Sequence, residues 1–176
     1  MEIFSQYADA VLEFTKNNQA WVIPVVFAFA FAESLAFLSL VVPSTVILVG
    51  ISGLLGASGV SFWPVWLAAG LGGSLGYALS YWIGLYFKDT IHTMWPFTKY
   101  PQMIPKGQQF FDKYGVFGVF LGHFFGPVRA VIPVVAGMYA MRQIPFQIAN
   151  VSSAFLWAAG VMGPAAFGMQ WFLGTN

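Results

Sequence analysis

Charged side chains are scarce in this sequence, and cysteine is missing altogether. Only 7% of the 176 residues are charged, 59% are hydrophobic, and the mean hydropathy is +0.74. Soluble domains carry about 25% charged residues, so this chain has too little charge to cover a surface that faces water. The absence of cysteine excludes disulfides, thiolate catalysis and cysteine-bound metals. The composition therefore predicts a protein whose main solvent is lipid.

The sequence also lacks the short motifs of common enzymes. It contains no HExxH, GxSxG or P-loop pattern and no paired-carboxylate motif. The acidic residues are too scattered to form a metal cluster, and the basic ones are too few for nucleic-acid binding. We therefore predict that the protein is not an enzyme and that it has no metal, cofactor or nucleic-acid partner.

Two apolar stretches without charged residues are each long enough to cross a bilayer. They cover residues 61–87, the clearer of the two, and about 146–173. A helix needs about 20 apolar residues to span the hydrocarbon core. Residues 2–16 place apolar and charged side chains on different sides of a helix, as in helices that lie in the membrane interface. Because this segment has no basic n-region, we interpret it as retained. These patterns predict an all-α integral membrane protein.

Two further apolar stretches, residues 20–57 and 115–141, are interrupted by proline. In the second, Pro127 separates two arms that are each too short to cross about 30 Å at about 1.5 Å per residue. Two short arms joined in this way predict a re-entrant hairpin. Pro43 divides the first stretch similarly, although residues 20–42 are long enough to span on their own. Broken backbone at membrane depth is tolerated only inside protein or around a wet cavity.

These pieces recur in the same order in both halves of the chain. Each half reads as an amphipathic helix, a broken apolar stretch and a spanning helix, which predicts one membrane domain built from an inverted repeat (residues 1–87 and 104–174). The loop 88–114 has four Lys against two Asp, whereas residues 2–16 have one Lys against three acids. Positive residues favour the cytoplasmic side, so we place this loop inside and the N-terminus outside. The two hairpins would then meet near the midplane, where transporters with inverted repeats bind substrate.

Glu33 and Arg129 are ionisable residues within the broken apolar stretches. A charge in hydrocarbon costs at least about 2.5 kcal/mol, so Glu33 needs a proton or a cationic partner. We interpret Glu33 as an acid that binds protons or couples transport; the alternative is a structural ion pair, most simply with Arg129. The planar guanidinium of Arg129 matches the oxygens of a phosphate or carboxylate. The alternative for Arg129 is a side chain that extends to the interface.

Three other polar residues are weaker candidates. His123 could titrate near neutral pH, or it could be a packed, hydrogen-bonded side chain. Ser44 and Thr45 follow Pro43 and could bind a ligand, but for Thr45 we favour a role in capping the start of a half-helix.

Small residues recur every four positions on the two spanning stretches. They are Gly72, Gly76, Ser80 and Gly84 on the first, and Asn150, Ala154 and Ala158 on the second. Such spacing lets helices approach closely in lipid. We favour close packing within one chain over the alternative, a homodimer interface.

Several longer motifs resemble the DedA family of membrane proteins, which is related to the VTT-domain proteins. The strongest match is the run YGVFGVFLGHFFGPVRAVIPVVAGMYAM followed by FQIANVSSAFLW, and AESLAFLSLVVPS agrees in the first half. The matching residues are Gly122, Phe124, Pro127, Arg129, Pro133, Ala136, Gly137, Phe146, Asn150 and Trp157, with Glu33 and Pro43 in the first half. The resemblance covers nearly the whole chain.

The resemblance implies two opposed re-entrant hairpins, a link to the proton-motive force, and transport of lipids such as undecaprenyl phosphate. The family's functional residues are two acids and two arginines. Glu33 matches the first acid and Arg129 the second arginine, whereas Thr45 and His123 stand where the other acid and arginine are usual. Tyr77 stands where many relatives have Asp. Because of these departures, it stays open whether transport is strictly coupled to protons. A different substrate and passive scrambling are the alternatives.

We therefore expect a lipid transporter of the bacterial inner membrane, flippase- or scramblase-like, for undecaprenyl phosphate or another anionic phospholipid. Arg129 and His123 would bind the phosphate, and Glu33 would carry a coupling proton. The supporting residues would be Pro43, Ser44, Thr45, Tyr77, Pro127 and Asn150. Two alternatives are a proton-coupled carrier for a small solute and a non-transporting scaffold for envelope assembly.

Overall fold

A computed structural model describes residues 17–35, 44–58, 61–90, 93, 97–125, 129 and 131–173, with only the backbone described at positions 19, 44–47, 170 and 173. All regular structure in these ranges is helical, as predicted. The helices are α2 (Gln19–Ser34), α3 (Ser44–Ser58), α4 (Phe62–Tyr86), α5 (Met103–Gly122), α7 (Ile132–Met138) and α8 (Gln143–Leu173). The predicted interfacial helix 2–16, Pro43 and Pro127 lie outside the described residues.

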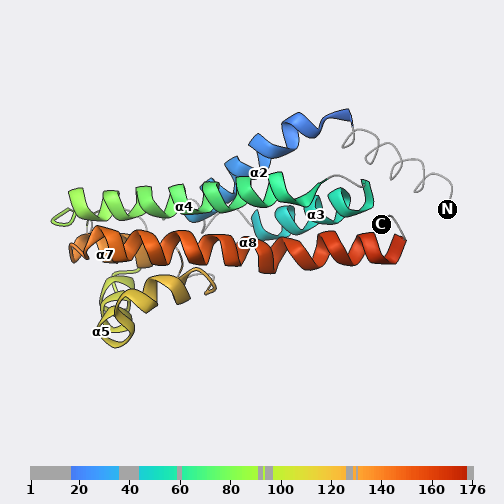
Figure 1. Ribbon diagram of the computed structural model, residues 1–176. Coiled ribbons are helices and arrows are strands. Elements are labelled where there is room, and N and C mark those ends of the chain that lie inside the picture. The colour runs from blue at the N-terminus through green and yellow to red at the C-terminus, as the bar shows by residue number, and fades with distance from the viewer. Residues whose placement is uncertain are drawn as a thin grey trace.

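The long helices α4 and α8 run side by side in opposite directions and form the axis of the molecule (Figure 1). Near one end, Trp66 Nε1 donates to the carbonyl oxygen of Phe155 at 3.0 Å. Near the other, the Tyr81 hydroxyl donates to the carbonyl oxygen of Met141 at 2.6 Å. Residue numbers rise along α4 as they fall along α8, so the pair is antiparallel. The two predicted long helices are therefore confirmed as helices.

The two long helices differ in how apolar they are. Of the described helices, α8 is both long and apolar enough to cross a membrane, over residues Gln143–Met169. Helix α4 has 25 residues and carries glycine, serine, tryptophan and tyrosine among its aliphatic residues. The stretch 61–87 was predicted as the clearer span, and by this measure α8 is the clearer one.

The small residues of α4 bring neighbouring helices to backbone contact. A Cβ atom at Gly72 would collide with the carbonyl of Phe27 in α2, and one at Gly84 would collide with the carbonyl of Val134 in α7. The Ser80 hydroxyl lies between two carbonyl oxygens, that of Gly76 in its own helix at 2.9 Å and that of Ser34 in α2 at 3.3 Å. The prediction of close packing within one chain is confirmed for these positions.

In the first broken stretch, the first helix ends earlier than the position of Pro43 predicts. Helix α2 stops at Ser34, and Leu35 is extended, with φ −75° and ψ 131°. At 16 residues α2 is about 24 Å long, which is less than the hydrocarbon thickness of about 30 Å. The alternative that residues 20–42 form one spanning helix is therefore wrong. Helix α3 then begins at Ser44, directly after Pro43.

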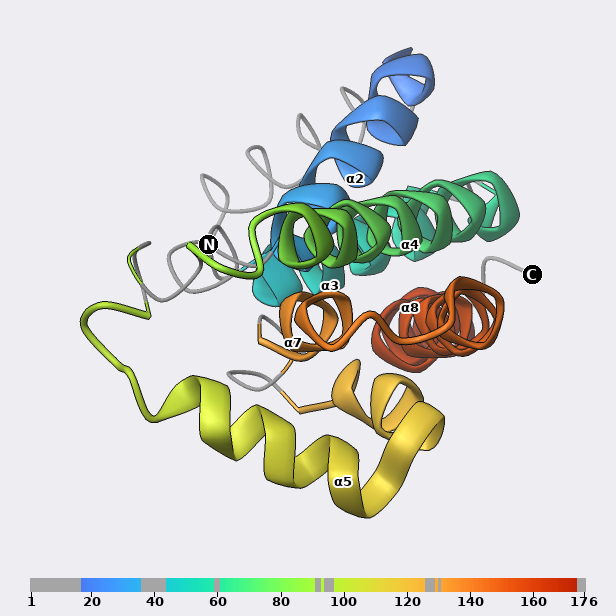
Figure 2. The same cartoon turned by 90° about the vertical axis from the view of Figure 1, so that its left-hand side faces the viewer.

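The second broken stretch begins with a bend inside α5. Gly115 has φ 53° and ψ −135°, a conformation that glycine adopts without the steric cost of a Cβ atom. The bend separates a charged first part from an apolar second part, which turns toward α7 and α8 (Figure 2). The charged first part of α5, which begins at Met103, agrees with the amphipathic helix predicted at the start of the second half, inside the stretch 88–114.

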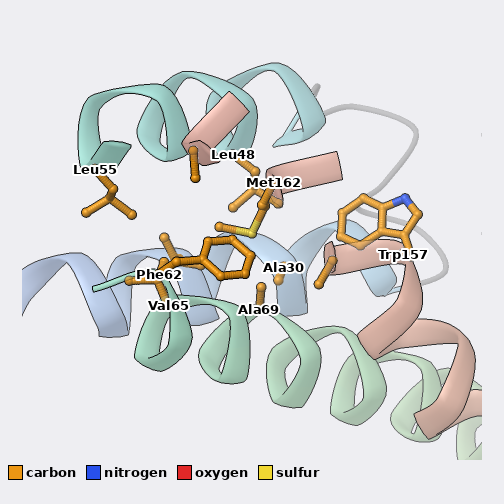
Figure 3. Packing of buried hydrophobic residues seen from close by; sticks show 11 residues of the cluster. Ala30, Leu48, Leu55, Phe62, Val65, Ala69, Trp157 and Met162 are labelled. Carbon is orange, nitrogen blue, oxygen red and sulfur yellow. The ribbon is translucent and has the colours of Figure 1, made fainter. Parts of the chain in front are cut away.

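Two apolar clusters lie at opposite ends of the α4–α8 pair. The first core joins α2, α3, the first half of α4 and the second half of α8 (Figure 3). It consists of Val26, Ala30, Leu48, Leu55, Phe62, Val65, Ala69, Trp157, Ala158, Met162 and Ala166. The second core joins α4 and α8 to α5 and α7. It consists of Tyr77, Tyr81, Val119, Ile132, Ala136, Phe146 and Ala149.

Candidate functional site

Buried polar side chains gather where the two cores meet, and we call this group the polar layer. Its members come from the end of α2, the middle of α4, the first half of α8 and the segment that follows α5. They are Glu33, Ser34, Ser74, Tyr77, His123, Arg129, Asn150 and Ser153, and all are buried. The polar layer therefore unites segments that are far apart in the sequence.

An ion pair between Glu33 and Arg129 lies at the centre of the polar layer. Arg129 Nη1 donates to Glu33 Oε1 at 3.0 Å, although the two residues are 96 positions apart. Arg129 Nη2 donates to Ser34 Oγ at 2.8 Å. Because a buried charge is costly unless it is paired and hydrogen-bonded, each partner makes the burial of the other tolerable. The predicted pairing of Glu33 with Arg129 is confirmed, and the alternative of an interfacial Arg129 is wrong.

An aromatic ring covers one face of the guanidinium of Arg129. The carbon at the centre of the guanidinium lies 4.2 Å from the ring centroid of Trp157. Such a cation–π contact attracts the cation to a rigid surface. Trp157 and Ser34 therefore restrict the orientation of Arg129, while Glu33 supplies its counter-charge.

His123 is held by α8 and α4. Its Nδ1 atom lies 3.1 Å from Ser153 Oγ, and Ser153 Oγ donates to the carbonyl oxygen of Asn150 at 3.0 Å. A hydroxyl has a single proton to donate, so the Nδ1–H tautomer of His123 goes with a bond from Ser153 to Asn150, and the Nε2–H tautomer with a bond from Ser153 to Nδ1. The ring of Tyr77 packs against the imidazole with centroids 4.4 Å apart. His123 is thus both packed and hydrogen-bonded, as the simpler of its two interpretations predicts.

Four polar atoms of the polar layer have no hydrogen-bond partner among the described residues. They are Tyr77 Oη, His123 Nε2, Arg129 Nε and Asn150 Oδ1. Asn150 uses its amide nitrogen to bind the carbonyl oxygen of Ser74 at 2.9 Å, which joins α8 to α4. An unmet donor or acceptor in a buried position costs about 1–3 kcal/mol. The set contains both donors and acceptors, so it can bind a ligand or water that offers both.

The structure brings five of the predicted site residues together: Glu33, Tyr77, His123, Arg129 and Asn150. Ser44 and Thr45 lie in the first turn of α3, but their side chains are outside the described part of the chain. In that part, no group of three or more His, Cys, Asp or Glu side chains is placed to hold a metal ion.

Sequence reasoning did not assign a role to Ser34, Ser153 or Trp157. Ser34 directly follows Glu33, and Trp157 belongs to the family pattern, so the sequence contained a signal that could have placed both residues in the site. Serine is common in membrane helices and usually bonds to its own helix backbone, as Ser52 does at 2.7 Å to Leu48. Nothing in the sequence around Ser153 separates it from such residues.

Comparison with known proteins identifies the relatives of this chain. Residues 42–166 match the VTT domain. The chain is 34% identical over 150 residues to the inner membrane protein YabI of Escherichia coli K12, covering 84% of this chain and 59% of that protein. It is 31% identical over 144 residues to the uncharacterized membrane protein BU139 of Buchnera aphidicola from Acyrthosiphon pisum, covering 82% and 56% respectively. No solved structure matches the chain.

The match to the VTT domain includes α3, α4, α5, α7 and most of α8. The segments that carry His123, Arg129 and Asn150 therefore all lie within it, whereas Glu33 lies just before it. The chain spans between about half and three-fifths of the length of the curated relatives it matches.

Proposed function

The chain belongs to the DedA family of VTT-domain membrane proteins, and from this premise we propose that it transports an anionic lipid across the bacterial cytoplasmic membrane. The substrate class is a lipid phosphate, either undecaprenyl phosphate or another anionic phospholipid. The protein would act as a flippase or scramblase. The observation that carries the proposal is the buried ion pair of Glu33 and Arg129, beside polar atoms without a partner.

Arg129 is suited to bind the phosphate group. Its guanidinium is planar, permanently charged and matched to two oxygens of a phosphate. Two of its nitrogens are used by Glu33 and Ser34, while Nε has no partner among the described residues. A phosphate would therefore compete with Glu33 for a cation that is already oriented.

Glu33 would control access to Arg129. While it is ionised, Glu33 neutralises the guanidinium; once protonated, it would release Arg129 to the incoming phosphate. This exchange would couple lipid binding to proton uptake. Tyr77 Oη, and His123 Nε2 in the tautomer that carries its proton there, would donate to phosphate oxygens, while Asn150 Oδ1 would accept the proton of a singly protonated phosphate.

The broken stretches would act as two re-entrant hairpins. Support comes from the short helices α2 and α7, from the bend at Gly115, and from the presence of one ionic partner on each stretch. In this arrangement the hairpins enter from opposite faces as parts of an inverted repeat, residues 1–87 and 104–174. The polar layer would then lie near the midplane of the membrane, where it would be accessible from each face in turn.

The orientation in the membrane follows from the lysines. We place residues 88–114 in the cytoplasm and the N-terminus outside. Because the chain has no cysteine, a single cysteine at Lys99 can be labelled without background. In inverted and right-side-out vesicles, a membrane-impermeant maleimide should label Lys99→Cys only from the cytoplasmic side. Labelling from the outside would reverse the orientation.

Reconstituted protein tests the function directly. In liposomes that contain a fluorescent lipid phosphate in both leaflets, the wild-type protein should make the inner-leaflet pool accessible to a membrane-impermeant quencher. The Arg129→Ala variant should lose this activity, whereas Arg142→Ala, which removes an exposed cation, should keep it. Failure of the wild-type protein to move lipid, or full activity of Arg129→Ala, would refute the proposal.

A further inference from the structure

An apolar groove lies between the second part of α5 and the start of α8. Its walls are Val116, Phe117 and Phe120 on α5, and Pro145, Ile148 and Ala149 on α8. The groove is open to the surroundings, has a volume of about 350 Å³, and has no charged residue in its walls. The bend at Gly115 forms it, because the bend turns the apolar part of α5 onto α8.

Both walls of the groove are close to polar-layer residues along the chain. Phe120 precedes His123 by three positions, so the two residues are separated by about one turn of chain. On the opposite wall, Ala149 is followed directly by Asn150. Both His123 and Asn150 carry a buried polar atom without a partner among the described residues. An apolar groove and a polar site therefore lie on the same two segments.

We propose that this groove binds the hydrocarbon chain of the lipid whose phosphate lies at Arg129. The inference rests on the proposed function and deepens it by giving the chain a site of its own. An amphiphile is the occupant that fits both parts, because its head needs polar partners and its chain needs an apolar wall. The open side of the groove lets the chain enter sideways from the bilayer while the phosphate occupies the polar layer.

A second copy of this protein fits the groove less well. An apolar helix from another chain would cover Phe117 and Ile148, which are 60% and 66% exposed. It would not supply a hydrogen-bond partner to His123 Nε2 or Asn150 Oδ1, because both atoms are buried. A lipid phosphate satisfies the groove and these atoms together.

A bulky residue introduced on the rim of the groove tests the hydrocarbon-chain site independently of the phosphate site. The Ile148→Trp variant places a large ring in the groove at an exposed position, so the core stays intact. The matched control is Leu156→Trp, at a 53% exposed position of the same helix that does not line the groove. Val116→Trp repeats the test from the facing wall. Thermal unfolding of each variant in detergent identifies any that fail to fold.

Two probes in detergent solution provide the measurements: a long-chain lipid phosphate and glycerol phosphate, which has the head group only. We expect Ile148→Trp and Val116→Trp to weaken binding of the long-chain probe about tenfold, the loss caused when about two methylene groups leave an apolar site. Binding of glycerol phosphate should stay unchanged in both variants. Leu156→Trp should bind both probes as the wild-type protein does.

The outcomes distinguish failure of the groove from failure of the proposed function. If Arg129→Ala loses both probes but Ile148→Trp and Val116→Trp match Leu156→Trp, the groove holds bulk lipid only and the inference is wrong. If all three tryptophan variants weaken the long-chain probe equally, the effect is not specific to the groove, and the inference is also wrong. If the wild-type protein binds neither probe, the proposed function itself fails, and the inference fails with it.

Discussion

The first core and the polar layer are both buried against the same pair of long helices, yet they are held together by different forces. The first core contains aliphatic, aromatic and thioether side chains from four helices (Figure 3). In lipid such residues gain little from leaving the solvent, because acyl chains are as apolar as leucine, so shape and dispersion hold the helices together. The polar layer instead depends on a few directional contacts between charged and hydroxyl groups.

This difference indicates how each region should respond to substitution. A lost contact in the first core leaves a cavity, which surrounding side chains can partly fill. A lost partner in the polar layer leaves a charge or a hydrogen-bonding group buried, and no rearrangement of apolar neighbours can replace it. Stability should therefore depend on both regions, whereas transport should depend on the polar layer and on Trp157, the first-core residue that contacts Arg129.

The largest effect should follow from breaking the ion pair on one side only. Arg129→Ala leaves the carboxylate of Glu33 buried without its cation, which costs about 3–5 kcal/mol when a buried pair is broken. The double variant Glu33→Ala/Arg129→Ala removes both charges and should recover much of this loss. Reversible unfolding in mixed micelles measures the free energies, and a double-mutant cycle gives the coupling. Equal stability of the single and double variants would show that the pair is not coupled.

A cavity in the first core should have the next largest effect. Met162 is fully buried, and replacing it by alanine removes contacts worth about 2–5 kcal/mol in soluble proteins. The control is Met169→Ala on the same helix, where the side chain is 39% exposed. The same unfolding measurement should show a clear loss for Met162→Ala alone. Lipid transport per folded molecule should stay at the wild-type rate, and a specific loss of transport would contradict the division between the two regions.

Removing a single hydroxyl from the polar layer should have the smallest effect on stability and still reduce transport. Ser34→Ala deletes the oxygen that accepts a hydrogen bond from Arg129 Nη2 at 2.8 Å, and a hydrogen bond to a charged group contributes about 1.5–3 kcal/mol. Because Arg129 would then be less well oriented, the transport rate in liposomes should fall. Ser152→Ala, which removes an exposed hydroxyl bonded to its own helix, is the control. Equal transport by the two variants would exclude a role for Ser34 in orienting Arg129.

Several features of the fold were predictable because they depend on nearby residues. The all-helical structure, the two long helices and the close packing of the α4 glycines follow from runs of apolar and small residues. The end of α2 did not follow in this way. The sequence has its helix breaker at Pro43, but the helix already stops at Ser34, whose hydroxyl accepts a hydrogen bond from Arg129 in the polar layer.

The sequence by itself determined that Glu33 and Arg129 must be exceptional, because a charge within a long apolar stretch is costly wherever it lies. It did not determine the detailed surroundings of the pair. Only the tertiary structure placed Ser34 and Trp157 around Arg129 and set Ser153 against His123, since these contacts join segments from α2, α8 and the turn after α5. The cost of burying a charge is set by local composition. The groups that offset this cost are set by which helices meet.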